Sequence, residues 1–388
     1  MIPYGRQDIQ EPDISAVLEV LKSDFLTQGP IVPRFEDCIA TYCQARRAVA
    51  VNSATSALHI ALLALEVGVG DMVWTSPNTF VASSNAALYC GASIDFVDID
   101  PQTYNMSVSA LEKKLADAKR SGQLPKVVIP VHIAGQPCDM ERIHALAVRY
   151  SFRVLEDASH AIGAKYNGEP TGNCNYSDIT VFSFHPVKIV TTAEGGMAVT
   201  NDDVLADKME LYRSHGITRD PRLMSHPPDG PWYYEQIALG YNYRLTELQA
   251  ALGVSQMQRL DAYMARRHEI ATRYNDELAD LPITLPFQQD FSQSAYHLYI
   301  IRLHQEAIAP RTHAQVFQDL RDREIMVNLH YIPVHTQPYY QSLGFSWGDF
   351  PNSEAYYRSA ISIPMYPKLT HSEQSYVIKS LHDVLNNT

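Results

Sequence analysis

FRVLED at residues 152–157 and VFSFHPVKIVTTAEGG at 181–196 decide the fold, because each contains an apolar, strand-like run that ends near one ionisable group. Continuous apolar runs are typical of strands that helices cover on both faces of a sheet. The ionisable groups are Asp157 in the first stretch and Lys188 in the loop predicted after the second run. Because charged side chains are seldom buried without partners, we expect both groups to belong to a site.

Similar runs surround these two and alternate with helical stretches. The predicted strands cover residues 48–52, 72–76, 94–99, 126–134, 152–157, 180–184 and 197–201. The predicted helices between them cover residues 54–66, 79–90, 107–120, 139–150 and 203–214. This alternation predicts an α/β fold with a mainly parallel sheet wrapped by helices.

The chain changes character after residue 218. Five of the residues at 219–232 are proline or glycine, which predicts an irregular loop, and residues 245–281 read as a long helix, broken at most once. Shorter elements follow, at 296–303, 311–323, 325–331, 360–364 and from about 371. We therefore expect a large domain at 1–245, with an N-terminal arm at 1–30, and a smaller C-terminal α+β domain at 246–388.

Composition excludes several classes of protein. The 388 residues are 46% apolar and 19% charged, as in a globular protein, and the net charge of −12 argues against a nucleic-acid or acidic-membrane binder. Neither a basic-then-apolar leader nor a stretch apolar enough to span a membrane is visible. The five cysteines form no CxxC pair, so we expect reduced thiols and a cytoplasmic location.

The segment NSATSAL at 52–58 follows a predicted strand and opens a predicted helix. Small polar residues there leave backbone N–H groups free at a helix N-terminus, which favours binding of a phosphate group. An ordinary helix cap would give the same pattern. No Walker lysine and no GxGxxG motif is present, so a nucleoside triphosphate or dinucleotide site of those types is not indicated.

Asp157, Lys188 and Phe80 complete the pattern. Asp157 ends a strand, where ligands of open α/β sheets bind, and Phe80 begins a helix, where an aromatic ring could stack on a planar ligand. Taken singly, they also fit a salt bridge, a surface lysine and a core aromatic. Together with the phosphate turn they suit pyridoxal 5′-phosphate (PLP), whose aldehyde bonds a lysine and whose ring nitrogen pairs with an acid.

The sequence resembles the DegT/StrS family of PLP-dependent nucleotide-sugar aminotransferases nearly from end to end. The motifs that carry the resemblance are long and occur in a fixed order. They are SDFLTQGP (23–30), NSATSAL (52–58), SPNTFVAS (76–83), EDASHAIGA (156–164), FSFHPVK…TTAEGG (182–196), RSHGI (213–217), GYNYRLTELQAALG (240–253) and HYIPVHTQPYY (330–340). The resemblance implies an aspartate-aminotransferase-like fold, PLP fold type I.

The resemblance also implies roles for individual residues. Lys188 and Asp157 would be catalytic: Lys188 would hold PLP covalently and move a proton, and Asp157 would pair with the ring nitrogen. The remaining cofactor-binding residues implied are Ala54, Thr55 and Ser183 at the phosphate, Phe80 on the ring, His160 on the ring-hydroxyl side, and Asn242. Since Asn242 would reach the phosphate of the partner subunit, the resemblance implies a homodimer with shared active sites.

For the substrate, the resemblance implies transamination at C4 of a UDP-linked 4-keto-6-deoxy-N-acetylhexose, with L-glutamate as donor, in pseudaminic acid biosynthesis. Gln28, Arg244, His330 and Tyr331 are the candidate sugar-nucleotide contacts. No metal site is expected, since His330 and His335 lack carboxylate or cysteine partners at suitable spacing.

Three other functions stay open at this point. A dehydratase on the same fold would typically replace the lysine by histidine, and Lys188 is present. A sister aminotransferase could act at C3 or on a D-xylo 4-keto sugar, because pocket shape sets that choice. A non-enzymatic PLP-fold regulator would not need Lys188, Asp157 and the phosphate turn together.

Overall fold

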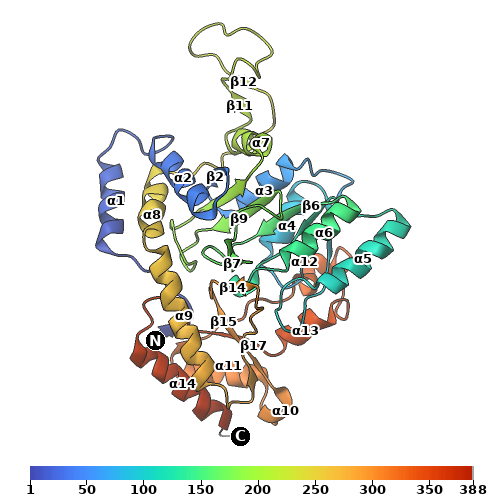
Figure 1. Cartoon of the computed structure of the whole chain (residues 1–388), viewed down its shortest axis with the longest axis vertical. Coiled ribbons are helices and arrows are strands. Elements are labelled where there is room, and N and C mark those ends of the chain that lie inside the picture. The colour runs from blue at the N-terminus through green and yellow to red at the C-terminus, as the bar shows by residue number, and fades with distance from the viewer. Residues whose placement is uncertain (387–388) are drawn as a thin grey trace.

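A computed structural model describes residues 1–386, and its centre is a seven-stranded sheet (Figure 1). The strand order is β2-β10-β9-β6-β5-β3-β4, and only β10 runs antiparallel to its neighbours. The strands are β2 (Arg47–Val51), β3 (Met72–Thr75), β4 (Ser93–Phe96), β5 (Val127–Ile129), β6 (Arg153–Asp157), β9 (Ile179–Ser183) and β10 (Gly196–Thr200). The predicted mainly parallel sheet is confirmed.

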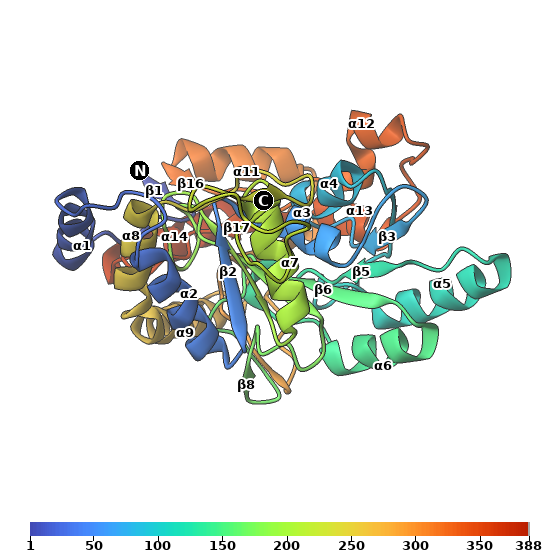
Figure 2. The ribbon, with the colours of Figure 1, turned by 90° about the horizontal axis from the view of Figure 1, so that it is seen from above.

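Side chains alternate between two helical layers along these strands, as the pleat of a β-sheet requires. Val49 and Leu155 face a core shared with α3 (Ala54–Ala64), α4 (Ala82–Tyr89) and α7 (Asp203–Arg213). The alternate residues face α2 (Ile31–Cys43), α5 (Val108–Ser121), α6 (Met140–Tyr150) and α8 (Glu247–Met257). Figure 2 shows this sandwich from above. Because both faces are covered, the strands are buried and read as apolar runs.

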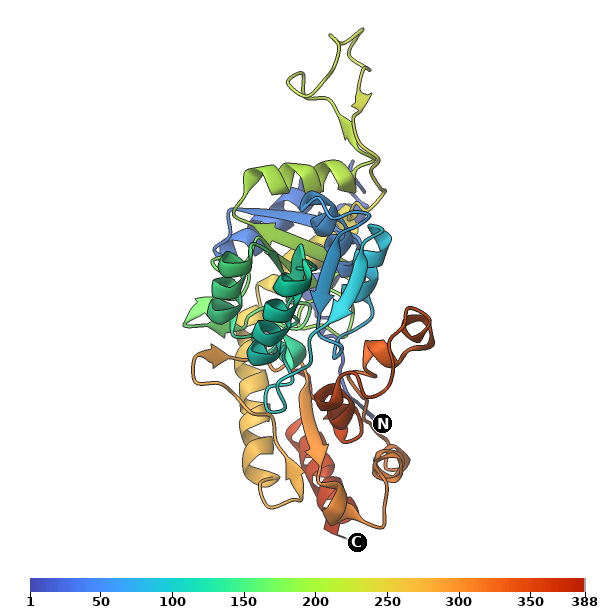
Figure 3. The same ribbon diagram turned by 90° about the vertical axis from the view of Figure 1, so that its right-hand side faces the viewer.

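A second core lies below the large sheet in Figure 3. It is built on a three-stranded antiparallel sheet of β13 (Ile283–Thr284), β15 (Tyr299–Leu303) and β17 (Ala360–Ile363). Three helices pack on it: α9 (Leu260–Glu277), α11 (His313–Asp322) and α14 (His371–Asn386). A smaller C-terminal α+β unit is therefore present, whereas the exact division at 245/246 stays a prediction.

The remaining elements are short. They are β1 (Ile2–Pro3), β7 (Lys165–Tyr166), β8 (Glu169–Pro170), β11 (Ile217–Thr218), β12 (Glu235–Gln236), β14 (Ser292–Gln293), α10 (Gln305–Ile308), β16 (Ile325–Met326), α12 (Pro338–Gln341), α13 (Pro351–Tyr357) and two 3₁₀ turns, Ile133–Gly135 and Val334–Thr336. The segment predicted as a strand at 126–134 keeps only three strand residues, because its second half forms the first of these turns.

The N-terminal arm differs from the expectation of a plain arm. It contains α1 (Glu11–Leu21), which packs along α8, and its first strand β1 pairs with β16 of the C-terminal unit. The long helix predicted at 245–281 is two helices, α8 and α9, with the break at residues 258 and 259. Neither α1 nor α2 was predicted from the sequence; each has proline only at its start, where a helix tolerates it.

The segment after α7 projects from the body as a hairpin, with β11 and β12 at its base (Figures 1 and 3). Its tip is irregular, as its prolines and glycine predict. Within residues 1–386, none of the helices combines the length and the apolar character that crossing a membrane requires.

Candidate active site

A cavity of about 860 Å³ lies at the carboxyl ends of β6 and β9, where the N-terminus of α3 also points. This is the position at which open α/β sheets bind their ligands. It brings together nine of the twelve residues predicted for the site. They are Ala54, Thr55, Phe80, Asp157, His160, Ser183, Lys188, His330 and Tyr331.

Asp157 is the last residue of β6 and is buried. Its Oδ2 accepts a hydrogen bond from the hydroxyl of Ser83 at 2.6 Å, and its Oδ1 accepts one from the backbone N–H of Ser159 at 3.1 Å. Asp157 follows Leu155 onto the sheet face covered by α4, and Ser83 belongs to that helix. The carboxylate is thus fixed in direction, with further lone pairs left for a ligand.

Lys188 lies in the loop after β9, as predicted. Two backbone bonds close the base of this loop, Phe184 N–H to the carbonyl of Gly195 and Thr192 N–H to the carbonyl of Phe184, both at 2.9 Å. Burial lowers the pKa of Lys188 from 10.5 to about 8, and the charge of Asp157 offsets part of that effect. A sizeable fraction of the amine is therefore neutral near physiological pH, as a nucleophile or proton carrier requires.

The phosphate turn at the start of α3 has the predicted form. Ser53 caps the helix by accepting from the N–H of Ser56 at 3.1 Å, and Ala54 and Thr55 line the cavity with the first helical turn. A Cβ on Gly196 would lie 2.5 Å from the backbone nitrogen of Ala54. The glycine of β10 therefore lets the helix N-terminus approach the sheet closely, and the amides that open the helix suit an anion.

Three histidines, His160, His297 and His330, and Tyr331 form one wall of the cavity. The rings of His160 and His297 lie 4.4 Å apart, and Nε2 of His160 lies 3.0 Å from the hydroxyl of Tyr331. Burial and the nearby charge of Lys188 lower the pKa of His160 well below its usual value and that of His330 to about 3. These two imidazoles are neutral at physiological pH.

Phe80 borders the cavity with an exposed side chain, 58% accessible. Its ring centre lies 6.0 Å from that of Tyr331. Most phenylalanine side chains pack in the core, whereas this ring is exposed on a cavity wall. The position suits stacking on a flat ligand.

Gln28, Asn242 and Arg244 do not line this cavity. Asn242 is exposed between Tyr241 and Tyr243, whose rings stack on each other and pack beside His59. Thr27 and Thr246 form an antiparallel bridge, so Gln28 and Arg244 lie on neighbouring segments. Arg244 also bridges Val51, the residue before the cavity residue Asn52, and Asn242 bridges Ser214. The three residues thus lie on segments next to the cavity or further along the surface, but their side chains do not line it.

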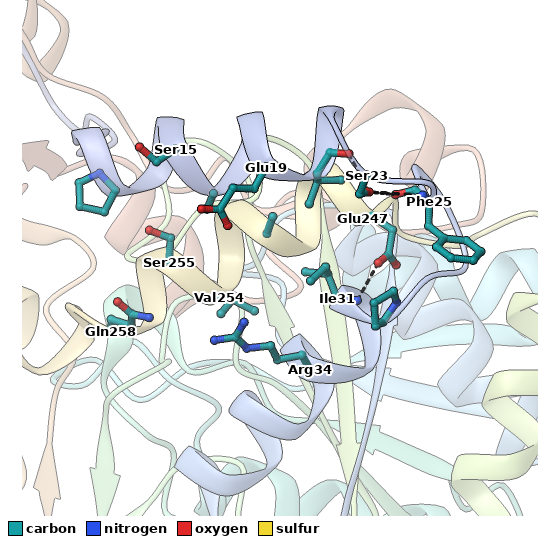
Figure 4. A pocket seen from close by; sticks show the side chains of 15 residues that line it. Ser15, Glu19, Ser23, Phe25, Ile31, Arg34, Glu247, Val254, Ser255 and Gln258 are labelled. Carbon is teal, nitrogen blue, oxygen red and sulfur yellow. Dashed lines mark hydrogen bonds between the residues drawn. The ribbon is translucent and has the colours of Figure 1, made fainter.

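Figure 4 shows a separate groove, near the segment that carries Gln28. A groove of about 520 Å³ lies between α1, α2 and α8, and the buried carboxylate of Glu247 accepts from the N–H groups of Ile31 at 2.6 Å and Val32 at 3.2 Å. A Cβ on Gly29 would lie 2.8 Å from that carboxylate. The segment that carries Gln28 is therefore tied to the start of α8, directly after Arg244.

Several cavity residues were not identified from the sequence. Tyr4, His297 and Asn328 line the cavity, and Ser83 lies behind its wall, where it bonds Asp157. A histidine inside the apolar run YHLYIIRL was a usable signal for His297. His335, by contrast, lies outside the cavity, where its Nε2 is 3.1 Å from Glu354. Across residues 1–386, no three His, Cys, Asp or Glu side chains converge to hold a metal ion.

Lys188 is the single lysine or arginine among the residues 1–386 that line the cavity. Two carboxylates, Asp157 and Glu194, border it as well. The site fits PLP in the parts that its ring and aldehyde need: an oriented carboxylate, an amine of lowered pKa, an open helix N-terminus and a free aromatic face. For additional anionic groups of a substrate, the cavity of one chain offers little positive charge.

Residues 7–382 match the DegT/DnrJ/EryC1/StrS aminotransferase family. Two relatives align over nearly the whole chain. The spore coat polysaccharide biosynthesis protein SpsC of Bacillus subtilis is 39% identical, over 99% of this chain and 97% of its own. The UDP-4-amino-4,6-dideoxy-N-acetyl-beta-L-altrosamine transaminase of Campylobacter jejuni is 36% identical, over 99% and 98%.

Two solved structures have the same fold from end to end. The putative sugar aminotransferase Spr1654 of Streptococcus pneumoniae, in its PMP form, superposes with a TM-score of 0.91 at 30% identity and covers 100% of both chains. Helicobacter pylori PseC, an aminotransferase involved in the biosynthesis of pseudoaminic acid, superposes with a TM-score of 0.90 at 32% identity, again over 100% of both. The predicted PLP fold type I is confirmed.

Proposed function

The chain belongs to the DegT/DnrJ/EryC1/StrS aminotransferase family and is a PLP-dependent aminotransferase; we propose that its substrate is a UDP-linked 4-keto-6-deoxy-N-acetylhexose, aminated at C4. L-glutamate is the proposed donor, and pseudaminic acid biosynthesis in the cytoplasm the proposed setting. The observation that carries the reaction type is the pairing of Lys188, with its lowered pKa, and the oriented Asp157 in one cavity.

When bound, PLP supplies an aldehyde that bonds amines and a ring that accepts electrons. Asp157 holds a proton at the ring nitrogen, and Ser83 keeps the carboxylate aimed at it. The Nζ of Lys188 would hold the cofactor and, when released, would accept and return a proton. Such a base works best with a pKa near the operating pH, which burial provides here.

Anchoring is the task of the remaining cofactor residues. Ala54, Thr55 and Ser183 hold the phosphate from the start of α3 and the end of β9, and Phe80 covers the ring. Fixing the phosphate fixes the reacting carbon near Lys188, and this positioning accounts for much of the rate in reactions between bound groups. His330 and Tyr331 line the same cavity, and His330 is the proposed sugar contact there.

We further propose that two chains form a homodimer in which each site is completed by the other subunit. Asn242 is exposed, and neither Asn242 nor Arg244 lines the cavity of its own chain. The cavity itself lacks the positive charge that a diphosphate needs. Docking the segment that carries these two residues in one subunit against the cavity of the other supplies both: Asn242 for the cofactor phosphate and Arg244 for the diphosphate.

A second candidate is a sister aminotransferase that acts on a different keto sugar, at C3 or of the D-xylo series. The 39% identity to a protein of spore coat polysaccharide biosynthesis favours it, since that exceeds the 36% to the altrosamine transaminase. Both candidates use the same cofactor machinery and differ only in the sugar.

The test supplies the purified holoenzyme with L-glutamate and with UDP-4-keto sugars of both C5 configurations, and follows amino sugar formation by mass spectrometry. Amination of the L-arabino 4-hexulose alone supports the proposal. Preference for the D-xylo sugar contradicts it and supports the sister enzyme. Lys188→Ala, which lacks the reacting amine, is the matched control in each reaction.

A further inference from the structure

Both ring nitrogens of His160 already have partners in the protein. The backbone N–H of Ala134 points at Nδ1 from 3.3 Å, and Nε2 lies 3.0 Å from the hydroxyl of Tyr331. His160 has the position expected to serve the hydroxyl of the PLP ring. Its hydrogen-bonding capacity, however, is committed to Ala134 and Tyr331.

These two contacts fix the tautomer of His160. A nitrogen that accepts from a backbone N–H carries no hydrogen, so the hydrogen of the neutral imidazole must sit on Nε2. Burial and the charges of Lys188 and His330 lower the pKa of His160 well below its usual value, so the ring stays neutral and does not gain a second hydrogen. Nε2–H is consequently the donor, and the oxygen of Tyr331 is the acceptor.

The hydroxyl hydrogen of Tyr331 is then left over. No acceptor for it is found among residues 1–386, whereas Tyr331 lines the cavity. Burial together with the negative charge of Asp157 raises the pKa of Tyr331 far above its usual value, so the group stays a donor. Tyr331 is half-buried on the cavity wall, so its hydroxyl hydrogen is available to an acceptor inside the cavity.

We propose that Tyr331, held by His160, donates the hydrogen bond to the oxygen substituent of the PLP ring beside the carbon that Lys188 binds. The inference deepens the proposed function and rests on its cofactor site, but not on the identity of the sugar. His160 is in this arrangement a positioning residue that acts through Tyr331. The acceptor is the phenolic oxygen of the cofactor, which bears negative charge and lies on the reacting side of the ring.

Tyr331 is held from three sides, as a directional donor needs. Its ring lies 26° from parallel to that of His160, its backbone N–H donates to Oδ1 of Asn78 at 3.3 Å, and Phe80 borders it. The hydroxyl therefore has one available direction of approach, toward the open cavity.

The turn that presents Ala134 is anchored as well. Ile133 N–H donates to Oδ1 of Asn105 at 2.9 Å, and Nε2 of His132 lies 2.7 Å from Glu156 behind β6. Nδ1 of His132 lies 3.1 Å from the backbone N–H of Cys138, which fixes the other side of this ring. Because this turn is fixed by buried side chains, the donor at Nδ1 of His160 is a permanent feature of the fold.

Several titratable groups surround this pair and share its electrostatic environment. They are Asp157, Lys188, His297, His330 and Tyr4. Donation by Tyr331 stabilises negative charge on the ring oxygen and so weakens the hold of that oxygen on the proton of the neighbouring Lys188 nitrogen. Removing the hydroxyl must raise the pH at which the bound cofactor changes colour.

The first experiment compares Tyr331→Phe with wild type by pH titration of the cofactor absorbance without substrates. The spectral midpoint rises by about one pH unit, because the variant loses one hydrogen bond to a charged acceptor. Cofactor affinity falls about tenfold for the same reason. Tyr274→Phe is the control: it removes a buried hydroxyl bonded at 3.0 Å to the carbonyl of Pro364, and leaves the midpoint unchanged. An unmoved midpoint in Tyr331→Phe overturns the inference.

The second experiment needs no cofactor and reads the tautomer in the wild-type protein. Nitrogen-15 NMR of histidine-labelled, cofactor-free wild-type protein reports the His160 tautomer, with His160→Gln used to assign the signal. Hydrogen on Nε2 supports the inference, and hydrogen on Nδ1 overturns it. The inference is also overturned if Tyr331→Phe changes the KM of the sugar and nothing else, because the hydroxyl of Tyr331 would then bind the substrate and not the cofactor. The proposed function is tested separately, by product formation in the wild type.

Discussion

The hydroxyl of Ser83 lies 2.6 Å from Oδ2 of Asp157, and this hydrogen bond joins α4 to the last residue of β6 at the cavity. The same hydroxyl lies 2.8 Å from Thr79, so a short chain of polar groups runs from the loop before α4 to the carboxylate. Ser83 is itself fully buried. The direction in which Asp157 faces the cofactor is therefore set by a helix as well as by its strand.

We expect Ser83→Ala to weaken cofactor binding about fivefold, since one hydrogen bond to the carboxylate contributes roughly 1 kcal/mol. Fluorescence titration of the cofactor-free protein with PLP measures the effect. Ser84→Ala is the matched control, because Ser84 is on the same helix but bonds Tyr340 outside the cavity. Equal affinities in the two variants would show that Asp157 does not depend on Ser83.

From the sequence alone, the strands of the large sheet and the two ionisable residues of the cavity, Asp157 and Lys188, could be predicted. Buried strands give apolar runs, and these located every strand of the large sheet to within a residue or two, except β4 and β5, which end earlier than predicted. Asp157, Lys188 and the turn at Ala54 were found because each combines a strand or helix end with a residue type that is unusual there. Local pattern and chemistry agreed at these positions.

The sequence did not reveal contacts made between distant segments. Ser83 is an ordinary small residue of α4, and nothing local indicates that it meets Asp157, 74 positions away. His297 and Tyr4 reach the cavity only because the C-terminal unit and β1 pack beside it. The helices α1 and α2 pack along α8, a contact that their own sequence does not indicate.

Lys188 makes the cofactor-free protein less stable at neutral pH. Its pKa is about 8 in the folded chain against an ordinary 10.5, so the folded state binds fewer protons than the unfolded state between these values. Stability due to this residue accordingly rises with pH through that window. We expect the free energy of unfolding, measured with urea, to be higher for cofactor-free Lys188→Met than for wild type at pH 7. The difference should shrink toward pH 10. Lys379→Met, at an exposed position, is the control.

Gly196 is expected to be essential for the phosphate turn. A methyl group there would lie 2.5 Å from the backbone of Ser53 and Ala54, so β10 or the start of α3 would have to move. We expect Gly196→Ala to lower affinity for PLP about tenfold or more, because the helix amides leave the phosphate. Gly68→Ala, which meets no atom within 4 Å, should bind PLP as wild type does. Normal binding by Gly196→Ala would remove the turn from the site.

Mixed dimers test the shared active site. We expect Lys188→Ala and Arg244→Ala chains to be nearly inactive alone, because one lacks the reacting amine and the other the cation for the diphosphate. In a mixed dimer one site combines both defects, whereas the other combines Lys188 of one chain with Arg244 of its partner and is intact. Random mixing makes half of the dimers mixed, so activity should recover to about a quarter of the wild-type value. Sites built from a single chain would give no recovery on mixing, since every site would then carry one of the two substitutions.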